Sequence, residues 1–358
     1  MRRLTRIAAT TAVIALALTG CAAEDEPGDT ASADLCDVEG DGPKVAVAYD
    51  VTGRGDKSFN DSAAVGIQKA IDDLGATCTE GEAAPDEGDP AREDRLRSLA
   101  ESGNNPVIGV GFAYSDAADK VGPDFPEVSF AVVDGFDPTP AEDGNSNNEN
   151  VAYLGFAEQE GSFLVGAAAA LKTETDHVGF VGGVNNDLIK KFEAGFVAGV
   201  EEVNPDIEVD VTYIEEEDLA GFNDPAGAKA AAAAMYDGDA DIVYHAAGLS
   251  GDGVFDAAVD AGDGNWAIGV DSDQYLTASA DAKPHILTSM LKRVDTATFE
   301  MIQSVADEEP LASYQTYDLK SDGISYSTSG GFIDDITGDI DGYAEQIESG
   351  EIKVPDAP

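Results

Sequence analysis

Short apolar runs alternate along the chain with stretches in which apolar residues recur every three or four positions. The first apolar run covers residues 45–49, and in residues 62–74 the apolar spacing is helical and ends at Gly75. A short apolar run is typical of a buried strand, helical spacing predicts a helix, and glycine commonly ends one. These two segments therefore predict a β-strand followed by an α-helix.

The same alternation predicts the elements of the remaining chain. In the first half we expect strands at 106–110, 129–133 and 151–156, one more beginning at Cys78, and helices at 92–101, 115–121 and 161–171. In the second half we expect strands at 177–181, 208–213, 241–245 and 266–270, and helices at 188–200, 226–235 and 253–261. One long amphipathic helix over 286–306, a strand-like run at 323–327 and a terminal helix complete the prediction.

Two successive β-α-β series predict the α/β class, with two doubly wound parallel-sheet lobes and a cleft between them. Such sheets bind ligands beyond the carboxyl ends of their strands. Several residues lie at the carboxyl ends of predicted strands: Asp50, Gly111, Phe112, Asp134, Gly183, Ala247, Gly248 and Asp271. We therefore expect a small-molecule site where these strand ends face each other across the cleft.

The loop 50–61, DVTGRGDKSFND, is the densest in polar and glycine residues. Its glycines permit tight turns, and Asn60, Asp61 or Ser62 can cap the helix that follows. It lacks the GxxxxGK[ST] and GxGxxG patterns of phosphate-binding loops, and Asp50 would repel a phosphate. Phe59 is an apolar ring in this polar segment, and we expect it either to pack beneath the loop or to lie against a flat ligand.

Four further side chains are candidates for ligand contact. Asp134 and Asp271 end corresponding strands in the two halves, where a carboxylate can accept hydrogen bonds from ligand hydroxyl or N–H groups. Phe192 opens the first helix of the second half, and Lys292 lies in the predicted helix 286–306. The alternatives are helix capping or plain surface for the two carboxylates, core packing for Phe192 and a surface position for Lys292.

The first twenty residues have the pattern of a secretory signal. Three arginines precede a short apolar run, and Gly20 and Cys21 follow it. The run is too short to span a bilayer. We expect residues 1–20 to be removed, Cys21 to carry a lipid, and residues 21–42 to form an acidic linker between the lipid and the folded lobes. An ordinary signal peptide with a chance cysteine is the alternative.

The chain is strongly acidic, with 71 Asp and Glu against 20 Lys and Arg among 358 residues and a formal net charge of −51. Such a charge argues against binding to nucleic acid, whose phosphates need basic side chains, and against a large footprint on anionic lipid. The acidic residues are spread along the chain, which favours a solubilising surface suited to salt. An acidic surface that recruits a basic partner is the alternative.

Cys36 and Cys78 are the other two cysteines. Cys36 precedes the first predicted strand and Cys78 begins the second, so neighbouring strand ends can bring them within bonding distance. Outside the cell thiols can be oxidised. We therefore predict a Cys36–Cys78 disulfide, with two free thiols as the alternative.

Metal binding and catalysis find little support in the sequence. His177, His245 and His285 are scattered, and residues 337–348 match a calcium-binding EF-hand loop only in part. The G-x-S-x-G motif of many hydrolases is absent. We expect no metal, no cofactor and no enzymatic activity.

Nine segments, specific in combination and order, carry a resemblance to a known family. They are GDKSFND (55–61), VIGVGF (107–112), FAVVD (130–134), NVAYLGFAEQEGSFLVGAAAA (150–170), GFVGG (179–183), KKFEAGF (190–196), AAGLSGDGV (246–254), GVDSDQ (269–274) and TSMLKRVD (288–295). Over about residues 43–330 the chain resembles the basic membrane protein family of bacterial lipoproteins, the PnrA-like nucleoside receptors of ABC importers. The resemblance implies a type I periplasmic-binding-protein fold, with two lobes joined by a hinge. We expect lobe 1 to comprise 43–155 and about 280–310, and lobe 2 to comprise 156–279 and about 311–358.

The resemblance also implies roles for eight residues around a purine nucleoside. Phe59 and Phe192 would sandwich the base, while Asp134 and Asn60 would hydrogen-bond its edge. Asp50 would support the loop or contact the ligand. Asp271 and Lys292 would hold the ribose hydroxyls, and Gly248 would approach the ligand closely.

The function that the resemblance implies is a monomeric receptor, lipid-anchored on the extracytoplasmic face of the cell membrane, that captures purine nucleosides and delivers them to an ABC permease. One alternative is the same receptor class with a sugar or another small polar solute as ligand. A surface sensor that is not coupled to import, and an extracellular nucleoside-cleaving enzyme, are the others.

Overall fold

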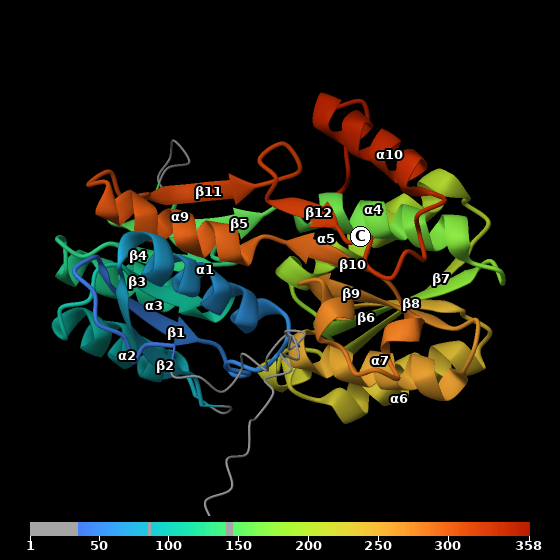
Figure 1. Cartoon of the computed structure of the whole chain (residues 1–358), viewed down its shortest axis with the longest axis horizontal. Helices are drawn as coiled ribbons and strands as arrows, with labels where there is room; N and C mark the ends of the chain where they lie inside the picture. The colour runs from blue at the N-terminus through green and yellow to red at the C-terminus, as the bar shows by residue number, and fades with distance from the viewer. Residues whose placement is uncertain (1–34, 85–86, 141–145) are drawn as a thin grey trace, which may run out of the picture. The chain divides into compact units, whose positions relative to one another are not determined.

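The computed structural model describes residues 35–84, 87–140 and 146–358, and it contains two sheets covered by helices (Figure 1). The first sheet has six strands. All its neighbouring strands are parallel, and their order across the sheet is β11-β5-β4-β3-β1-β2. The strands are β1 (Lys44–Tyr49), β2 (Thr77–Glu82), β3 (Val107–Val110), β4 (Phe130–Val133), β5 (Val151–Phe156) and β11 (Ser313–Tyr317).

The second sheet repeats this arrangement with the order β12-β10-β9-β8-β6-β7. Its strands are β6 (His177–Val184), β7 (Glu208–Glu215), β8 (Ile242–Ala246), β9 (Trp266–Asp271), β10 (Ile286–Lys292) and β12 (Ile324–Tyr326). All pairs are parallel except β12, which runs antiparallel to β10. Position by position, β4 in the first sheet therefore corresponds to β9 in the second.

Helices cover both faces of each sheet (Figure 1). The helices on the first sheet are α1 (Phe59–Leu74) and α9 (Val294–Ala306) on one face, and α2 (Asp89–Glu101) and α3 (Ser115–Val121) on the other. Those on the second are α4 (Glu158–Lys172) and α5 (Asp187–Val203) on one face, and α6 (Pro225–Asp237) and α7 (Gly251–Ala261) on the other. Two further helices are α8 (Gln274–Thr277) and α10 (Thr337–Ser349). The predicted α/β class with two doubly wound lobes is confirmed.

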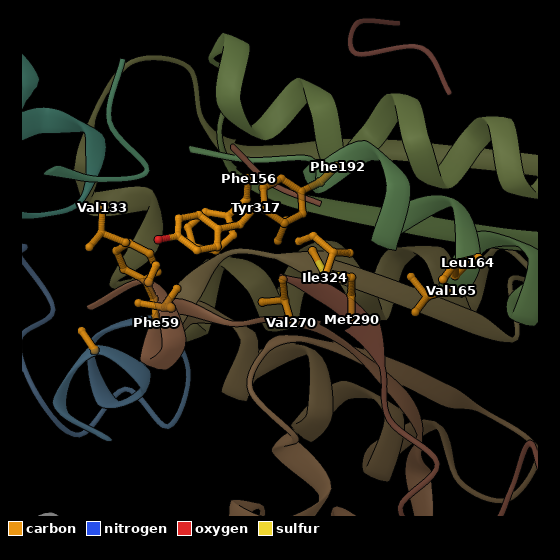
Figure 2. Packing of buried hydrophobic residues seen from close by; sticks show 14 of the residues in the cluster. Phe59, Val133, Phe156, Leu164, Val165, Phe192, Val270, Met290, Tyr317 and Ile324 are labelled. Atoms are coloured by element: carbon orange, nitrogen blue, oxygen red, sulfur yellow. The ribbon is translucent and has the colours of Figure 1, made fainter. Parts of the chain in front are cut away.

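Burial on both faces explains why the strands could be recognised as apolar runs. All four residues of β3 and of β4 are buried, and so are all six of β5. Parallel sheets need helices on both faces, so nearly every strand position meets apolar side chains. One contiguous apolar cluster joins the two lobes and contains both Phe59 of the first lobe and Met290 of the second (Figure 2). It includes the ring pair Phe156–Tyr317.

The expected long helix over 286–306 is wrong in its first part. Residues Ile286–Lys292 form β10, which pairs with β9, and a helix begins only at Val294. A strand of ILTSMLK buries six of its seven residues inside the second sheet. The burial of these residues in the sheet outweighs the helical spacing of their apolar positions. The same spacing continues into α9, because no glycine or proline separates β10 from that helix.

Strand pairing also changes the expected lobe boundaries. The expectation put 280–310 in lobe 1 and 311–358 in lobe 2, yet β10 belongs to the second sheet and β11 to the first. The chain therefore crosses between lobes three times: after β5, after β10, and between β11 and β12.

Several N-terminal predictions fall outside the described residues. These are the signal peptide 1–20, the lipid on Cys21 and most of the linker 21–42. The Sγ atoms of Cys36 and Cys78 lie 1.95 Å apart, with their Cα atoms separated by 4.8 Å, in the arrangement of a disulfide that ties the chain before β1 to β2. Among the described residues, no helix combines the length and the apolar character needed to cross a membrane.

Candidate functional site

A cavity lies between the two lobes, against the carboxyl ends of strands from both sheets. Seven of the eight residues expected from the sequence line it: Asp50, Phe59, Asp134, Phe192, Gly248, Asp271 and Lys292. The eighth, Asn60, does not.

Asp134 and Asp271 occupy equivalent positions in the two sheets. Asp134 follows β4 and Asp271 ends β9, the corresponding strand, and both have a left-handed backbone, with φ of 57° and 64°. Aspartate is one of the few residues with a side chain that adopts this conformation readily. The sharp turn at each strand end thus brings one carboxylate from each lobe to the same cavity.

Lys292 connects the two carboxylates. Its Nζ lies 2.7 Å from Asp134 Oδ2 and 3.3 Å from Asp271 Oδ1. Lys292 is the last residue of β10, next to Asp271 on β9, so its ion pair with Asp134 crosses from one lobe to the other. The sequence predicted this residue at the site, although on a helix rather than at a strand end.

Two carboxylate oxygens in this cluster have no hydrogen-bond partner among the described residues. Asp134 Oδ2 accepts from Lys292 and Asp271 Oδ2 accepts from Ser58 Oγ, but neither Oδ1 atom accepts a hydrogen bond from any described residue. Asp271 Oδ1 instead has the longer ion pair with Lys292, at 3.3 Å. A buried acceptor without a donor is costly and uncommon. The two Oδ1 atoms are therefore the natural partners of hydroxyl or N–H donors on a ligand.

The charges of this cluster favour a neutral ligand rich in donors. Burial alone would lower the pKa of Lys292, but Asp134 and Asp271 raise it above its usual value and keep the ammonium charged. Burial raises the pKa of Asp134, and Lys292 opposes that rise. The pKa of Asp50 is raised by burial as well. Among the residues that the structure describes, four acidic side chains, those of Asp50, Asp56, Asp134 and Asp271, line the cavity with the single ammonium of Lys292, and this balance disfavours a phosphate, as the sequence suggested for Asp50.

Aromatic rings line much of the remaining wall. Lys292 Nζ lies 4.8 Å from the ring centroid of Phe59 and 5.3 Å from that of Phe192, so both rings flank the ammonium as well as the cavity. Phe112 and Phe222 meet edge to face across the cavity, with centroids 6.5 Å apart. The sequence predicted Phe112 only as a residue at a strand end and assigned it no contact with a ligand.

Phe222 was missed in the sequence. It ends a short 3₁₀ turn, Leu219–Phe222, which has no strand end or helical spacing to mark it. The phenylalanine before the Asn-Asp-Pro start of α6 was the only available signal.

Asn60 supports the loop instead of facing the cavity, which corrects its expected place at the edge of a base. Its side chain is fully buried, and its Nδ2 lies within 3.0 Å of acceptor oxygens on Asp50, Thr52 and Asp56. Its Oδ1 accepts from the backbone N–H of Asp50. With both ends of the amide engaged, Asn60 fixes Asp50 and the start of α1, which carries Phe59.

Asp56 is the anchor of the same loop. Its carboxylate accepts from the backbone N–H groups of Ser58, Asn60 and Asp61, at 2.8–3.1 Å. Burial raises the pKa of Asp56 to about 7 despite these hydrogen bonds. No apolar spacing or motif distinguishes this aspartate from its neighbours, so the sequence did not identify it.

The loop also contacts the second lobe directly. Ser58 Oγ donates to Asp271 Oδ2 at 2.9 Å, and Ser272 Oγ donates to the carbonyl oxygen of Ser58 at 3.0 Å. Lys57 forms an ion pair with Asp252 at 3.1 Å on the rim. These contacts hold the lobes together around the cavity.

The histidines lie away from this cavity. His245 is buried, and burial lowers its pKa to about 4. His177 lies beside Glu208 and Asp210 on β6 and β7, and in the described part of the chain this is the one group of such side chains close enough to hold a metal ion. None of the three lines the cavity.

Known proteins match the chain over most of its length. The family model described as ABC transporter substrate-binding protein PnrA-like (Bmp) matches residues 43–357. The ABC transporter nucleoside-binding protein BmpA of Lactococcus lactis is 32% identical over 94% of each chain. The CD4+ T-cell-stimulating antigen of Listeria monocytogenes is 34% identical over 88% of each chain. A solute-binding protein of an ABC transporter system from Aeropyrum pernix K1 has a similar structure, with a TM-score of 0.74 and 27% identity over 87% of this chain and 94% of its own.

The extent of these matches confirms the family resemblance carried by the nine sequence segments, and the solved structure confirms the type I periplasmic-binding-protein fold. Members of this family are extracytoplasmic, membrane-associated binding proteins rather than enzymes. The chain belongs to the Bmp family of PnrA-like substrate-binding proteins of ABC transporters.

Proposed function

We propose that this protein is a lipid-anchored receptor that captures purine nucleosides and delivers them to an ABC permease. The observation that carries the proposal is that the buried Oδ1 atoms of Asp134 and Asp271 accept no hydrogen bond from the described residues, in a cavity that aromatic rings also line. A nucleoside offers hydroxyl and N–H donors for the two carboxylates and a flat base for the rings. The Lactococcus relative is a nucleoside-binding protein by name, which supports this choice of ligand.

In the proposed complex, Phe59 and Phe192 contact the faces of the base. Asp134 Oδ1 accepts from an N–H group on the edge of the base, and Asp271 with Lys292 holds the ribose diol. Because Lys292 lies between both carboxylates, the base edge and the ribose would bind on either side of one ammonium group. Gly248 has φ of 55° and no side chain, which lets the ligand approach the backbone closely.

Delivery to a permease rests on the family and on the expected anchor at Cys21. Ligand binding would favour the closed arrangement of the lobes, because only that arrangement brings Asp134 and Asp271 to one ligand. The permease would then distinguish the closed receptor from the open one.

Calorimetric titration tests the ligand class. Purified protein would be unfolded and refolded to remove bound ligand, then titrated with guanosine, inosine, adenosine, cytidine, guanine and ribose. We expect micromolar or tighter binding of purine nucleosides and no heat with ribose. Silence toward all six from folded protein would contradict the proposal and favour the same receptor class with a sugar or another polar solute.

The anchor is tested separately. Metabolic labelling with a radioactive fatty acid should label the wild-type protein and leave Cys21→Ser unlabelled. Equal labelling of both proteins, or of neither, would contradict the assignment of the lipid to Cys21.

A further inference from the structure

A second cavity adjoins the first between the lobes. The two share the wall formed by Phe112, Asp134 and Leu188. The second cavity has a volume of about 460 Å³, and it continues toward Gly155 and Tyr314 on the first lobe and Lys191 on the second. A ligand that fills the first cavity and reaches past Asp134 would therefore enter the second.

Glu158 makes the second cavity chemically distinctive. It is the first residue of α4, where the chain passes from the first lobe to the second, and its side chain is 0% exposed. Lys191 Nζ lies 3.1 Å from Glu158 Oε2, but Oε1 has no hydrogen-bond partner among the described residues. A wholly buried carboxylate oxygen without a donor is costly in a folded protein unless a ligand or water supplies one.

The charges around this cavity favour a donor over an acceptor. Its lining includes the acidic side chains of Asp134, Glu158 and Asp187 against the single ammonium of Lys191. Lys191 is already paired with Glu158, so an anionic substituent would meet an excess of negative charge. A hydroxyl or amino group would instead supply the missing donor to Oε1.

The rim of the cavity offers apolar surface for the part of a ligand that would carry such a group. Phe136 is 46% exposed and Tyr314 is 44% exposed, and both line the cavity. Exposed aromatic rings next to a buried carboxylate suit a short carbon chain that ends in a donor.

We propose that the second cavity is a subsite for a hydroxyl- or amino-bearing substituent on the base, so that the receptor binds purine nucleosides modified at the base edge that faces Asp134, with Glu158 Oε1 as acceptor. This inference rests on the proposed function, because it takes the base edge to lie at Asp134. It extends the ligand class from simple nucleosides to base-modified ones.

Three ligands test the subsite by calorimetry on the full-length protein purified in detergent. They are adenosine and two derivatives substituted on its exocyclic nitrogen, one with a propyl group and one with an aminoethyl group of nearly the same size and shape. Since a hydrogen bond between charged groups contributes about 1.5–3 kcal/mol, we expect the aminoethyl derivative to bind at least about tenfold more tightly than the propyl derivative. The propyl derivative itself should bind within about tenfold of adenosine, because the cavity has room for it.

A matched pair of variants assigns the effect to Glu158. Glu158→Gln should reduce the preference for aminoethyl over propyl to about threefold or less. Glu160→Gln, on the same helix, should keep the full preference because Glu160 lines neither cavity. An unchanged preference in Glu158→Gln would overturn the assignment.

The wild-type measurements decide the proposal even if Glu158→Gln does not fold. Equal binding of the two derivatives, or loss of binding for both while adenosine binds, would overturn the subsite and leave the nucleoside receptor intact. Silence toward all three ligands from folded protein would instead overturn the proposed function, and the subsite with it.

Discussion

Lys292 Nζ lies 2.7 Å from Asp134 Oδ2, and this ion pair joins a strand end of one sheet to a strand end of the other. Lys292 is 2% exposed and Asp134 is 8% exposed, so solvent screens the pair little. Removing one member of a buried pair leaves the other charge without compensation. The pair therefore couples the stability of the closed lobes to the groups that the ligand would contact.

Asp134→Asn tests this coupling. Asparagine keeps the shape and tolerates the left-handed backbone, but it removes the charge opposite Lys292. We expect the free energy of unfolding to fall by ~1–3 kcal/mol, less than the ~3–5 kcal/mol typical of a buried charge with no partner, because Asp271 remains. Guanosine affinity should fall about tenfold. Urea unfolding and calorimetry measure the two effects, with the exposed Asp263→Asn as control; unchanged values would contradict the role of the pair.

Asp271→Ala separates ribose recognition from base recognition. Loss of the carboxylate should weaken guanosine binding about 10–100-fold, because a hydrogen bond to a charged group is lost, while guanine binding changes by less than about threefold. Alanine at a left-handed position also lowers stability by ~1 kcal/mol, so the folded fraction is measured before titration. Equal guanosine affinity of wild type and variant would refute the assignment of Asp271 to the ribose.

Phe59→Leu and Phe192→Leu test stacking. Leucine preserves an apolar side chain under the loop but removes the aromatic face, and base stacking contributes ~1–3 kcal/mol per ring. We expect guanosine and guanine to lose affinity about equally, by roughly 5–100-fold. Phe130→Leu makes the same change in the apolar cluster beneath the first sheet, away from the cavity, and should leave affinity within about twofold. Retained affinity in both site variants would favour a non-aromatic ligand.

The Cys36–Cys78 bond is expected to form in the exported protein and to stabilise it. The cysteines are 42 positions apart, and closing a loop of that length contributes ~4 kcal/mol in the chain-entropy model. Reduced wild type and the double variant Cys36→Ser/Cys78→Ser should show the same decrease in the free energy of unfolding, measured with urea. Guanosine affinity should be unchanged, since neither cysteine lines the cavity. Free thiols in unreduced protein, measured by alkylation, would show that the bond does not form.

His245 should make stability fall as the solution becomes acidic. Burial lowers its pKa to about 4 in the folded protein, against about 6.5 in the unfolded chain, so between these values the unfolded chain binds more protons. Its contribution is fully present above pH ~6.5 and is lost, by up to ~3 kcal/mol, as the pH falls to about 4.

The comparison with His245→Leu isolates this contribution. Asp56, whose pKa is raised to about 7, has the opposite dependence over part of the same range, so the total curve mixes both signs. The free energy of unfolding should fall more for the wild type than for the variant as the pH is lowered from 7 to 4. The stability of the variant relative to the wild type should therefore rise over this range. A difference that is constant with pH would contradict a buried, neutral His245.

Most of the fold could be predicted from the sequence because its strands are buried on both faces. The runs at β1, β3, β5 and β9 are apolar nearly throughout, and an aspartate or glycine lies at the end of β1, β3 and β9. The strand β11 was missed for the opposite reason: Ser313–Tyr317 lies at a sheet edge, with only its last residue fully buried, so it carries no apolar run. The placement of β10 in a sheet depends on its pairing with β9 and β12, which are distant enough in the sequence that the local apolar pattern does not reveal the pairing.

The site was predicted in part for similar reasons. Residues after strand ends converge by topology alone, so Asp50, Asp134 and Asp271 could be expected together. The role of Asn60 could not, because it depends on three oxygens that surround its amide in space. Lys292 was expected at the site through the family resemblance, but its ion pairs with Asp134 and Asp271 were not, since they depend on β10 being a strand whose last residue faces the other lobe.

The late position of β11 in the chain has a consequence for biogenesis. Strand β5, all of whose residues are buried in the finished sheet, pairs on its outer side with β11 alone. All of the second sheet except β12 is synthesised before Ser313. Until then the newborn first lobe presents an open, apolar strand edge, the kind of surface that nucleates aggregation. Chains terminated before β11 would keep that edge uncovered and would be more prone to aggregate than the complete chain.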